Sequence, residues 1–412
     1  MSEKAPQSER LTNDDLVLML DAYDIWLQLP PSVLLNRFFT GNERADRRIA
    51  REFGGGVSRG LMRQTVVVSA QKGCMAPRDS ISNLHCDGVP ESTLPKNVYG
   101  LLTDSPLSRI LRWKYTRPKY VNSGSFMGPA SDVRRYFRRV KDRMDQNLLA
   151  MDEGQELGGD QGVFAEIFGE QESWRRRTQQ IGPGRDRAQT KLSGEFEYHV
   201  GLDYTQELFY PTCYSEHDSY FVSLNDAEEV ARESGRLGVS PPRVQGVPRD
   251  IEVAERPLSL LDDDGGDDAK RGGRGWGDLP LYVDFWTTAI PVAIHHNAWR
   301  DGLKNRRRTW WDKTWYFPYL RRLLQARVKL TETKAPPLVT LPALNGSLDV
   351  WPYFSTSQDT AAVLFVRNRN TTKEEWSLER ADWGAVCKSS NATMEAKRPW
   401  YDEVFRDGKG PL

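Results

Sequence analysis

The 412-residue sequence has little cysteine, no excess of either charge and no long apolar run. Its four cysteines are too few for a disulfide scaffold and form no Cys-x-x-Cys pair. Basic and acidic residues both number 57, so the net charge of zero argues against general attraction to nucleic acid or anionic membranes. No stretch approaches the roughly 18 consecutive apolar residues of a transmembrane helix. The first ten residues, MSEKAPQSER, also lack the apolar region of a signal peptide, so we expect a chain without a membrane span.

Cysteines and glycosylation patterns bear on the cellular compartment. Cys74 and Cys86 are close enough in sequence to bridge a loop, although isolated cysteines are more often simply buried. Three Asn-x-Ser/Thr acceptor patterns, at Asn345, Asn370 and Asn391, lie in the last part of the chain. Their clustering favours a secretory compartment without requiring one. We expect the lumen of the secretory pathway (Golgi or ER) if a signal or anchor precedes this chain, and the cytoplasm otherwise.

Two carboxylates follow the first predicted strand. Residues 16–20 (LVLML) are continuously apolar and predict a short buried strand, and Asp21 and Asp24 come after it. Ligands of open α/β sheets bind outside the carboxyl ends of the strands, so this position favours a functional role. The alternative is that Asp21 caps a turn and Asp24 is only solvated, because acidic turn residues are common.

Two of the five histidines end another predicted strand. The stretch YVDFWTTAIPVAIHHNA predicts a buried strand that ends in His295, His296 and Asn297. A strand-end histidine is often only structural. Because the carboxyl ends of parallel strands meet at one edge of a sheet, however, we expect Asp21, Asp24 and His295 to converge. Carboxylates with an imidazole suit Mn²⁺ or a related divalent ion, which would carry a diphosphate, better than Ca²⁺.

The first half of the chain predicts alternating strands and helices. Residues 61–70 and 120–128 predict further strands, the second running into a glycine turn, and residues 32–39 predict a short helix. A helix that opens at Ser131 has an apolar stripe and an arginine-rich face. We interpret this basic face as solvated rather than as a nucleic-acid site, because the net charge is zero.

The second half alternates between ordered and polar stretches. Residues 158–170 predict a loop that carries Asp160 and Gln161 into another helix. A polar tract at about 226–275 includes LDDDGGDDAKRGGRG, which cannot bury a core and predicts disorder. From about residue 336 the composition changes to short strand-like segments, which predict a C-terminal β-rich appendage.

Six short motifs follow one another in an order that points to one enzyme family. MLDAYDI corresponds to a strand followed by Asp-Ser-Tyr-Asp, VVVSAQKGC to Phe-Ser-Ala-Glu with a later Cys, and YVNSGSFMG to Leu-Asn-Ser-Gly-Gly-Phe-Ile-Gly. GDQGVFAEIF corresponds to Asp-Asp-Gln-Leu-Phe-Tyr, GLDYTQELF to Leu-Asp-His-Lys, and IPVAIHHNA to Pro-Ile-Val-Val-His-Gly-Asn. In these motifs the chain resembles the glycosyltransferase domain of the procollagen lysyl hydroxylase and collagen glucosyltransferase family. The resemblance covers roughly residues 14–305, and no hydroxylase domain is evident.

The resemblance implies an α/β fold of the GT-A class, which binds nucleotide-diphospho-sugars on a mainly parallel sheet. The family's first strand and uridine-binding turn would precede Asp21, where this chain has almost no room, so we expect the first βα unit to be lacking. The expected organisation is a GT-A-like domain over residues 1–335, with a disordered insertion at about 226–275, and a β-rich appendage over residues 336–412.

The resemblance also assigns roles to individual residues. Asp21, Asp24 and His295 would bind Mn²⁺. Tyr23 would stack on the uracil, and Asn122, Ser123 and Gly124 would form the floor of the sugar site. Asp160 and Gln161 would be the catalytic residues. Asn297 and Lys304 would bind the donor. Asp160 would face the donor sugar or the acceptor hydroxyl.

The chain departs from the family pattern at three positions that bear on these roles. Gly159 replaces the first aspartate of Asp-Asp-Gln, and Gln71 replaces the glutamate after Ser-Ala. The family's phosphate-binding lysine has no aligned counterpart, and Lys304 or Arg300 is the nearest substitute.

The implied activity is a Mn²⁺-dependent hexosyltransferase that moves a hexosyl group from a UDP-sugar to a hydroxyl of a protein or glycan. Two alternatives remain open. A degenerate or truncated GT-A-like module could bind a glycan or a partner without catalysis, and a metal-dependent hydrolase could use the same acidic and histidine residues. The fold class alone does not choose among them.

Overall fold

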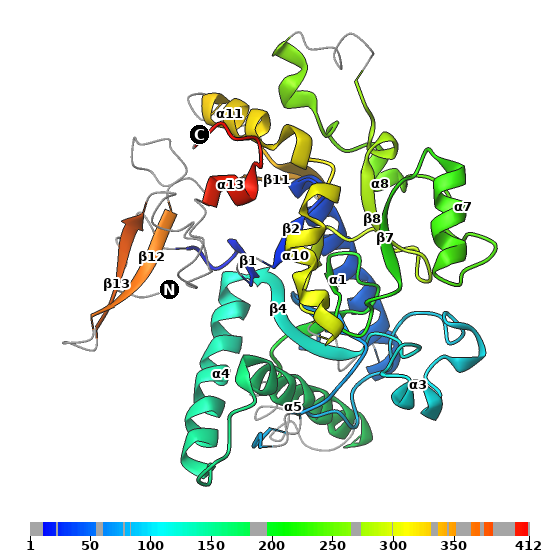
Figure 1. The fold of residues 1–412 in the computed structure, drawn as a ribbon. Coiled ribbons are helices and arrows are strands. Elements are labelled where there is room, and N and C mark those ends of the chain that lie inside the picture. Colours follow the sequence, from blue (N-terminus) through cyan, green and yellow to red (C-terminus); the bar gives the residue numbers. More distant parts are fainter. Residues whose placement is uncertain are drawn as a thin grey trace. The chain divides into compact units, whose positions relative to one another are not determined.

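The computed structural model describes most of the chain (Figure 1). The described residues are 11–21, 24–54, 61–76, 79–82, 84–181, 196–264, 273–298, 300–330, 337–343, 346–351, 364–370, 375–381 and 400–410. Their contacts form two compact units: a larger one of residues 11–254 and 276–314, and a smaller one of residues 1–10, 255–275 and 315–412. The candidate site lies entirely within the larger unit.

The larger unit contains a four-stranded sheet with the strand order β1-β4-β3-β5. These strands are β1 (Leu16–Leu20), β3 (Val66–Gln71), β4 (Tyr120–Pro129) and β5 (Val200–Asp203). Strand β4 is antiparallel to both β1 and β3, whereas β3 and β5 are parallel. The mixed α/β class is confirmed, but the expected mainly parallel sheet is wrong, because the reversed strand β4 lies between β1 and β3. Strands β1, β3 and β5 still share one direction, so their carboxyl ends lie at one edge.

Strand β4 bulges away from β3 beside the predicted site. Ser69 pairs with Asn122 and Val68 pairs with Phe126, so residues 123–125 have no counterpart on β3. The bulged residues face β1 instead, where the backbone nitrogen of Asp21 donates a 2.8 Å hydrogen bond to the carbonyl oxygen of Gly124. The glycine turn expected at the end of the 120–128 strand is wrong, because Gly128 lies within β4 and pairs with Val17 of β1. Bulges commonly re-aim side chains next to active sites.

A second sheet has the order β2-β9-β6. Its strands are β2 (Ile25–Leu27), β6 (Phe209–Pro211) and β9 (Ala293–His295). Strand β9 is antiparallel to β2 and parallel to β6, and Ile25 pairs with His295. The segment between β1 and β2 thus crosses from one sheet to the other, and it brings Asp24 to the end of β9. A separate antiparallel pair joins β7 (Ser219–Ser223) and β8 (Pro280–Asp284).

Three long helices belong to the larger unit: α1 (Pro31–Phe53), α4 (Ala130–Ala150) and α5 (Gly159–Ile181). Helix α1 begins at Pro31, a residue type favoured at the first helical position, and it extends well beyond the short helix expected at residues 32–39. The predicted apolar stripe of α4 is exposed at Met144 and Leu148, so it is confirmed only in the first part of the helix, which buries Val133, Tyr136 and Val140. These residues pack with α5 residues and with the fully buried Val66 and Val68 of β3 in one core.

The tract expected to be disordered contains folded elements. Helix α7 (Ala227–Arg236) begins after Asp226, whose side chain accepts a hydrogen bond from the backbone nitrogen of Glu229. Helix α8 (Arg249–Glu252) buries Ile251 completely. The prediction of disorder is wrong for the described residues 226–264, because a helix cap and a few apolar side chains order this polar segment. Residues 265–272 lie outside the described part.

The remaining elements complete both units. The larger unit also contains α3 (Pro106–Ile110) and α10 (Arg306–Thr309). The smaller unit contains α11 (Leu320–Leu330), the antiparallel pairs β10 (Val339–Ala343) with β11 (Gly346–Val350) and β12 (Leu364–Asn370) with β13 (Glu375–Ala381), and α13 (Trp400–Val404). Two antiparallel strand pairs thus lie within the described residues after 336, where the composition predicts a β-rich appendage. Asn370 ends β12, whereas Asn345 and Asn391 lie outside the described residues.

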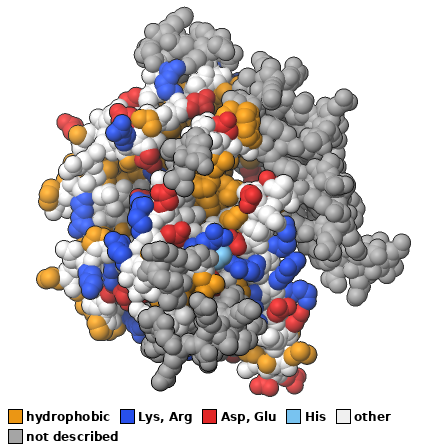
Figure 2. Space-filling view, turned by 180° about the vertical axis from the view of Figure 1, so that it is seen from behind, with side chains coloured by type: hydrophobic (Ala, Val, Ile, Leu, Met, Phe, Trp, Pro, Cys, Tyr) orange, Lys and Arg blue, Asp and Glu red, His pale blue; other side chains and the backbone are white. Residues whose placement is uncertain are grey.

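Three surface and covalent features bear on the sequence predictions. Cys74 and Cys86 form a disulfide, so the bridged loop is confirmed. Within the described ranges no helix is long and apolar enough to cross a bilayer. Figure 2 shows both basic and acidic side chains on the face that it draws.

Candidate metal centre

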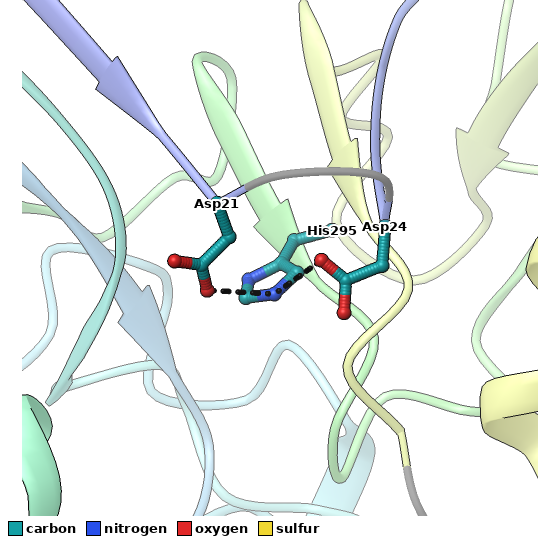
Figure 3. Close-up of side chains that lie close together, drawn as sticks. All are labelled: Asp21, Asp24 and His295. Atoms are coloured by element: carbon teal, nitrogen blue, oxygen red, sulfur yellow. Dashed lines mark ion pairs between the residues drawn. The ribbon is translucent and has the colours of Figure 1, made fainter. Parts of the chain in front are cut away.

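Asp21, Asp24 and His295 converge, as the sequence predicts (Figure 3). Nε2 of His295 lies 3.5 Å from Oδ2 of Asp21 and 3.6 Å from Oδ1 of Asp24. Asp21 follows β1 and His295 ends β9, but Asp24 immediately precedes β2. The site therefore lies where two sheets meet, rather than at one edge of a single parallel sheet.

The pKa values of the three side chains are shifted in directions that fit a site for a cation. Burial raises the pKa of Asp24, although Lys304 opposes this rise. Burial also raises the pKa of Asp21, where His295 opposes the rise and the charges of Asp24 and Asp160 add to it. Burial lowers the pKa of His295 to about 4, so its imidazole is neutral at neutral pH. A divalent ion would reduce the repulsion between the two clustered carboxylates, and a neutral imidazole can offer it a nitrogen lone pair.

The spacing of the donor atoms fits one divalent ion. Two neighbouring ligands that each lie roughly 2.1 Å from an octahedral ion are about 3 Å apart. One ligand atom from each of the three residues lies within 4.8 Å of the others, so small side-chain rotations suffice to reach this spacing. Two carboxylates and one imidazole also leave positions for further oxygen ligands, which suits Mn²⁺.

Asn122 contacts the ring of His295 on the side away from the two aspartates. Nδ1 of His295 lies 3.2 Å from Oδ1 of Asn122, which also accepts a 3.3 Å hydrogen bond from the backbone nitrogen of Gly124. The backbone N–H of Gly124 can only donate, so the atom of the Asn122 amide that it contacts must be the oxygen. Because this oxygen can only accept, Nδ1 of His295 must carry the proton in their contact. Nε2 of His295 therefore presents its lone pair to the carboxylates.

The amide nitrogen of Asn122 connects the centre to two glutamines. It donates to Oε1 of Gln71 at 3.0 Å and to Oε1 of Gln161 at 3.3 Å. Gln161 lies in the first turn of α5, one residue after Asp160. Asn122 is buried, so these bonds form a closed polar network that ties the start of α5 to the histidine.

Gly124 leaves the space that the cluster occupies. A Cβ atom at this position would overlap the His295 ring and would lie 2.7 Å from Oδ2 of Asp21. A glycine is therefore needed here for close approach of the backbone to the two side chains. Neighbouring Ser123 and Asp160 border a cavity that also reaches Asp21.

The other predicted binding residues differ in position. Nζ of the half-exposed Lys304, on the 3₁₀ helix η5 (Arg300–Asn305), lies 3.5 Å from Oδ2 of Asp24. The side chain of Asn297 instead accepts a 2.9 Å hydrogen bond from the backbone nitrogen of Cys213. Tyr23, which the resemblance places on uracil, lies outside the described residues.

His296 comes directly after β9, and it packs into the core instead of joining the cluster. It is buried against Trp26, with ring centroids 4.1 Å apart. Neither ring nitrogen has a hydrogen-bond partner among the residues that the structure describes. Burial lowers the pKa of His296 to about 3, so it is a neutral core residue.

Sequence reasoning missed the role of Asn122 as the partner of His295. The motif Asn-Ser-Gly implied only a floor for the sugar, and an asparagine within a strand carries no signal for a contact with a residue 173 positions away. Gln71, one of the departures from the family pattern, belongs to this network. Neither a protein-family model nor a curated protein matches this chain, so the centre is interpreted from its own geometry.

Proposed function

We propose that this protein is a Mn²⁺-dependent glycosyltransferase that transfers a hexosyl group from a UDP-sugar to a hydroxyl acceptor. The observation that carries this proposal is the convergence of Asp21, Asp24 and His295 beside the first turn of α5, which bears Asp160. Candidate metal ligands next to an exposed carboxylate at the mouth of a cavity suit a reaction with an anionic leaving group. We also propose a GT-A-like arrangement, which the shared direction of β1, β3 and β5 and the reversed β4 support.

Lys304 is placed to bind the diphosphate of the donor. Its ammonium group lies beside Asp24 and remains half exposed, so it can turn toward an anion held at the metal. The charge of Arg307 also acts on Asp24, which adds a second basic group at this end of the site. This local positive charge serves an anionic donor even though the whole chain is neutral.

In the transfer step the acceptor oxygen bonds to the anomeric carbon of the sugar. The bond between that carbon and the diphosphate oxygen breaks, and its electron pair leaves with UDP. Asp160 is exposed at the cavity and is placed to hold the acceptor hydroxyl or take its proton. Mn²⁺ bound by Asp21, Asp24 and His295 would offset charge on the leaving diphosphate. Asn122 keeps His295 oriented during the step.

The test is UDP release by the purified chain with Mn²⁺ and a panel of UDP-sugars, with and without glycoside acceptors. Acceptor-dependent release supports the proposal. Release to water alone would identify a hydrolase, and binding without release would identify a non-catalytic module. Asp160→Asn should lower turnover much more than UDP affinity, whereas Glu153→Gln, an exposed carboxylate in the turn before α5, should change neither.

A further inference from the structure

A cavity of about 360 Å³ opens beside the candidate metal centre. Most of its lining residues come from β1, β4, α4 and α5, whose positions in the fold are labelled in Figure 1. Its mouth is polar and includes Asp21, Ser123 and Asp160. Its wall is apolar and includes Met19, Phe126, Phe137, Val140, Met144 and Phe164. The volume lies at the lower end of the roughly 300–1,000 Å³ range of small-molecule pockets.

The apolar wall excludes the donor sugar from the inner part of the cavity. A hexose carries a hydroxyl on most of its carbons, and burying hydroxyls without hydrogen-bond partners is costly. The polar side chains that could satisfy such hydroxyls lie at the mouth and rim, where Lys141 and Asp145 of α4 form an ion pair. The donor sugar therefore fits the mouth, between Asp21 and Asp160, and the inner part suits an apolar group.

Two methionines make the wall adaptable. Met19 is 43% exposed and Met144 is 38% exposed, so both present flexible apolar side chains to solvent at the cavity. Exposed methionines that face a concave apolar wall are typical of surfaces that accept varied apolar ligands.

We propose that this cavity binds the apolar part of the acceptor, an alcohol or glycoside that carries an alkyl or aryl group, and that the acceptor hydroxyl points from the cavity toward Asp160. This inference rests on the proposed transferase function, because it names the acceptor class of the same site. In the transfer the hydroxyl proton goes to Asp160 or to water, the oxygen bonds to the anomeric carbon, and UDP leaves with the electron pair of the broken bond.

The test measures acceptor binding without turnover. Titration calorimetry of the full chain with hexyl, phenyl and methyl β-glucosides, in the absence of donor, compares the same sugar with different apolar groups. We expect the hexyl and phenyl glucosides to bind at least tenfold tighter than the methyl glucoside, because only they bury apolar surface in the cavity. Equal affinities for the three glucosides would overturn the inference.

Two matched variants on α4 locate the binding site. Met144→Glu places a charge on the wall and should abolish the preference for apolar groups. Leu148→Glu introduces the same charge one turn later, at an exposed residue that does not line the cavity, and should retain it. An identical effect of both variants would refute binding in this cavity. The inference would also be refuted if the wild-type chain self-associated and Met144→Glu abolished that association. In that case a second copy of the chain, and not an acceptor, would cover the apolar wall.

The two proposals fail in different ways. Tight binding of apolar glucosides without any UDP release would leave the cavity assignment standing as a ligand site and refute the transferase. Transfer that proceeds as efficiently to methyl as to hexyl glucoside would support the transferase and refute the acceptor class.

Discussion

Replacing Asn122 by alanine tests whether the polar network prepares His295 for a metal. Asn122→Ala removes the acceptor of the 3.2 Å contact with Nδ1 of His295, so the ring can turn or adopt the tautomer that protonates Nε2. Partners that orient a metal-binding histidine typically contribute 10–100-fold to metal affinity, which equals about 1.4–2.7 kcal/mol. We expect a loss of Mn²⁺ affinity in this range.

The same variant has a cost in stability that must be separated from the loss of affinity. Asn122→Ala leaves the backbone N–H of Gly124 and the Oε1 atom of Gln71 without their Asn122 partner in a buried position. An unsatisfied buried group costs about 1–3 kcal/mol, so the free energy of unfolding should fall by an amount of this order. Denaturant unfolding without metal measures this term directly.

The Asn122→Asp variant is the matched control. It keeps an oxygen that can accept from Nδ1 of His295, in the carboxylate–histidine arrangement found at many metal sites, while it alters the contacts with Gln71 and Gln161. We expect Mn²⁺ affinity, measured by electron paramagnetic resonance of free Mn²⁺, to be retained in Asn122→Asp and lost in Asn122→Ala. Unchanged affinity in a folded Asn122→Ala protein would refute the positioning role.

Three further predictions follow from other parts of the larger unit. Gly124→Ala should abolish Mn²⁺ binding measured by calorimetry, because the new Cβ would lie 2.7 Å from Oδ2 of Asp21; normal binding would show that the cluster is loosely built. Burial raises the pKa of Asp132, but hydrogen bonds from His199 and Thr65 outweigh it and lower the pKa from 3.8 to about 2. Its contribution is therefore present above pH 3.8 and lost toward pH 2, so the difference in unfolding free energy between wild type and Asp132→Asn should shrink over that window; a constant difference would contradict this. Replacing both cysteines of the disulfide, which are 12 positions apart, by serine should lower the unfolding free energy by about 3 kcal/mol in denaturant titrations, and no change would contradict a closed loop.

The sequence predicts the two strand ends of the site because both strands are short apolar runs. Asp21 directly follows the strand of residues 16–20, and His295 is the last residue of the strand of residues 293–295. Ligands of α/β sheets bind at the carboxyl ends of strands, so both positions could be predicted as functional. The position of Asp24 before β2 could not be predicted, because a three-residue strand is too short to show a period. The antiparallel direction of β4 could not be predicted either, because an apolar run does not reveal the direction of a strand in its sheet.

Long-range side-chain contacts account for the rest of what the sequence does not reveal. Asn122 meets Gln71 and His295 across 51 and 173 positions, and no local pattern predicts such pairs. In the polar tract after residue 225 the sequence predicts too little structure. Its composition predicts disorder, but the cap at Asp226 and the buried Ile251 are enough to fold its described part.

Mn²⁺ binding by four single variants tests the metal centre most directly. Electron paramagnetic resonance should show Mn²⁺ bound by the wild-type chain and lost in Asp21→Ala, Asp24→Ala and His295→Ala, with melting temperatures close to wild type. His296→Phe is the control, because His296 is a neighbouring buried histidine that faces away from the cluster against Trp26; it should bind Mn²⁺ normally. Unchanged binding in Asp24→Ala and His295→Ala would contradict the metal centre and leave the two aspartates as a capped turn between two sheets.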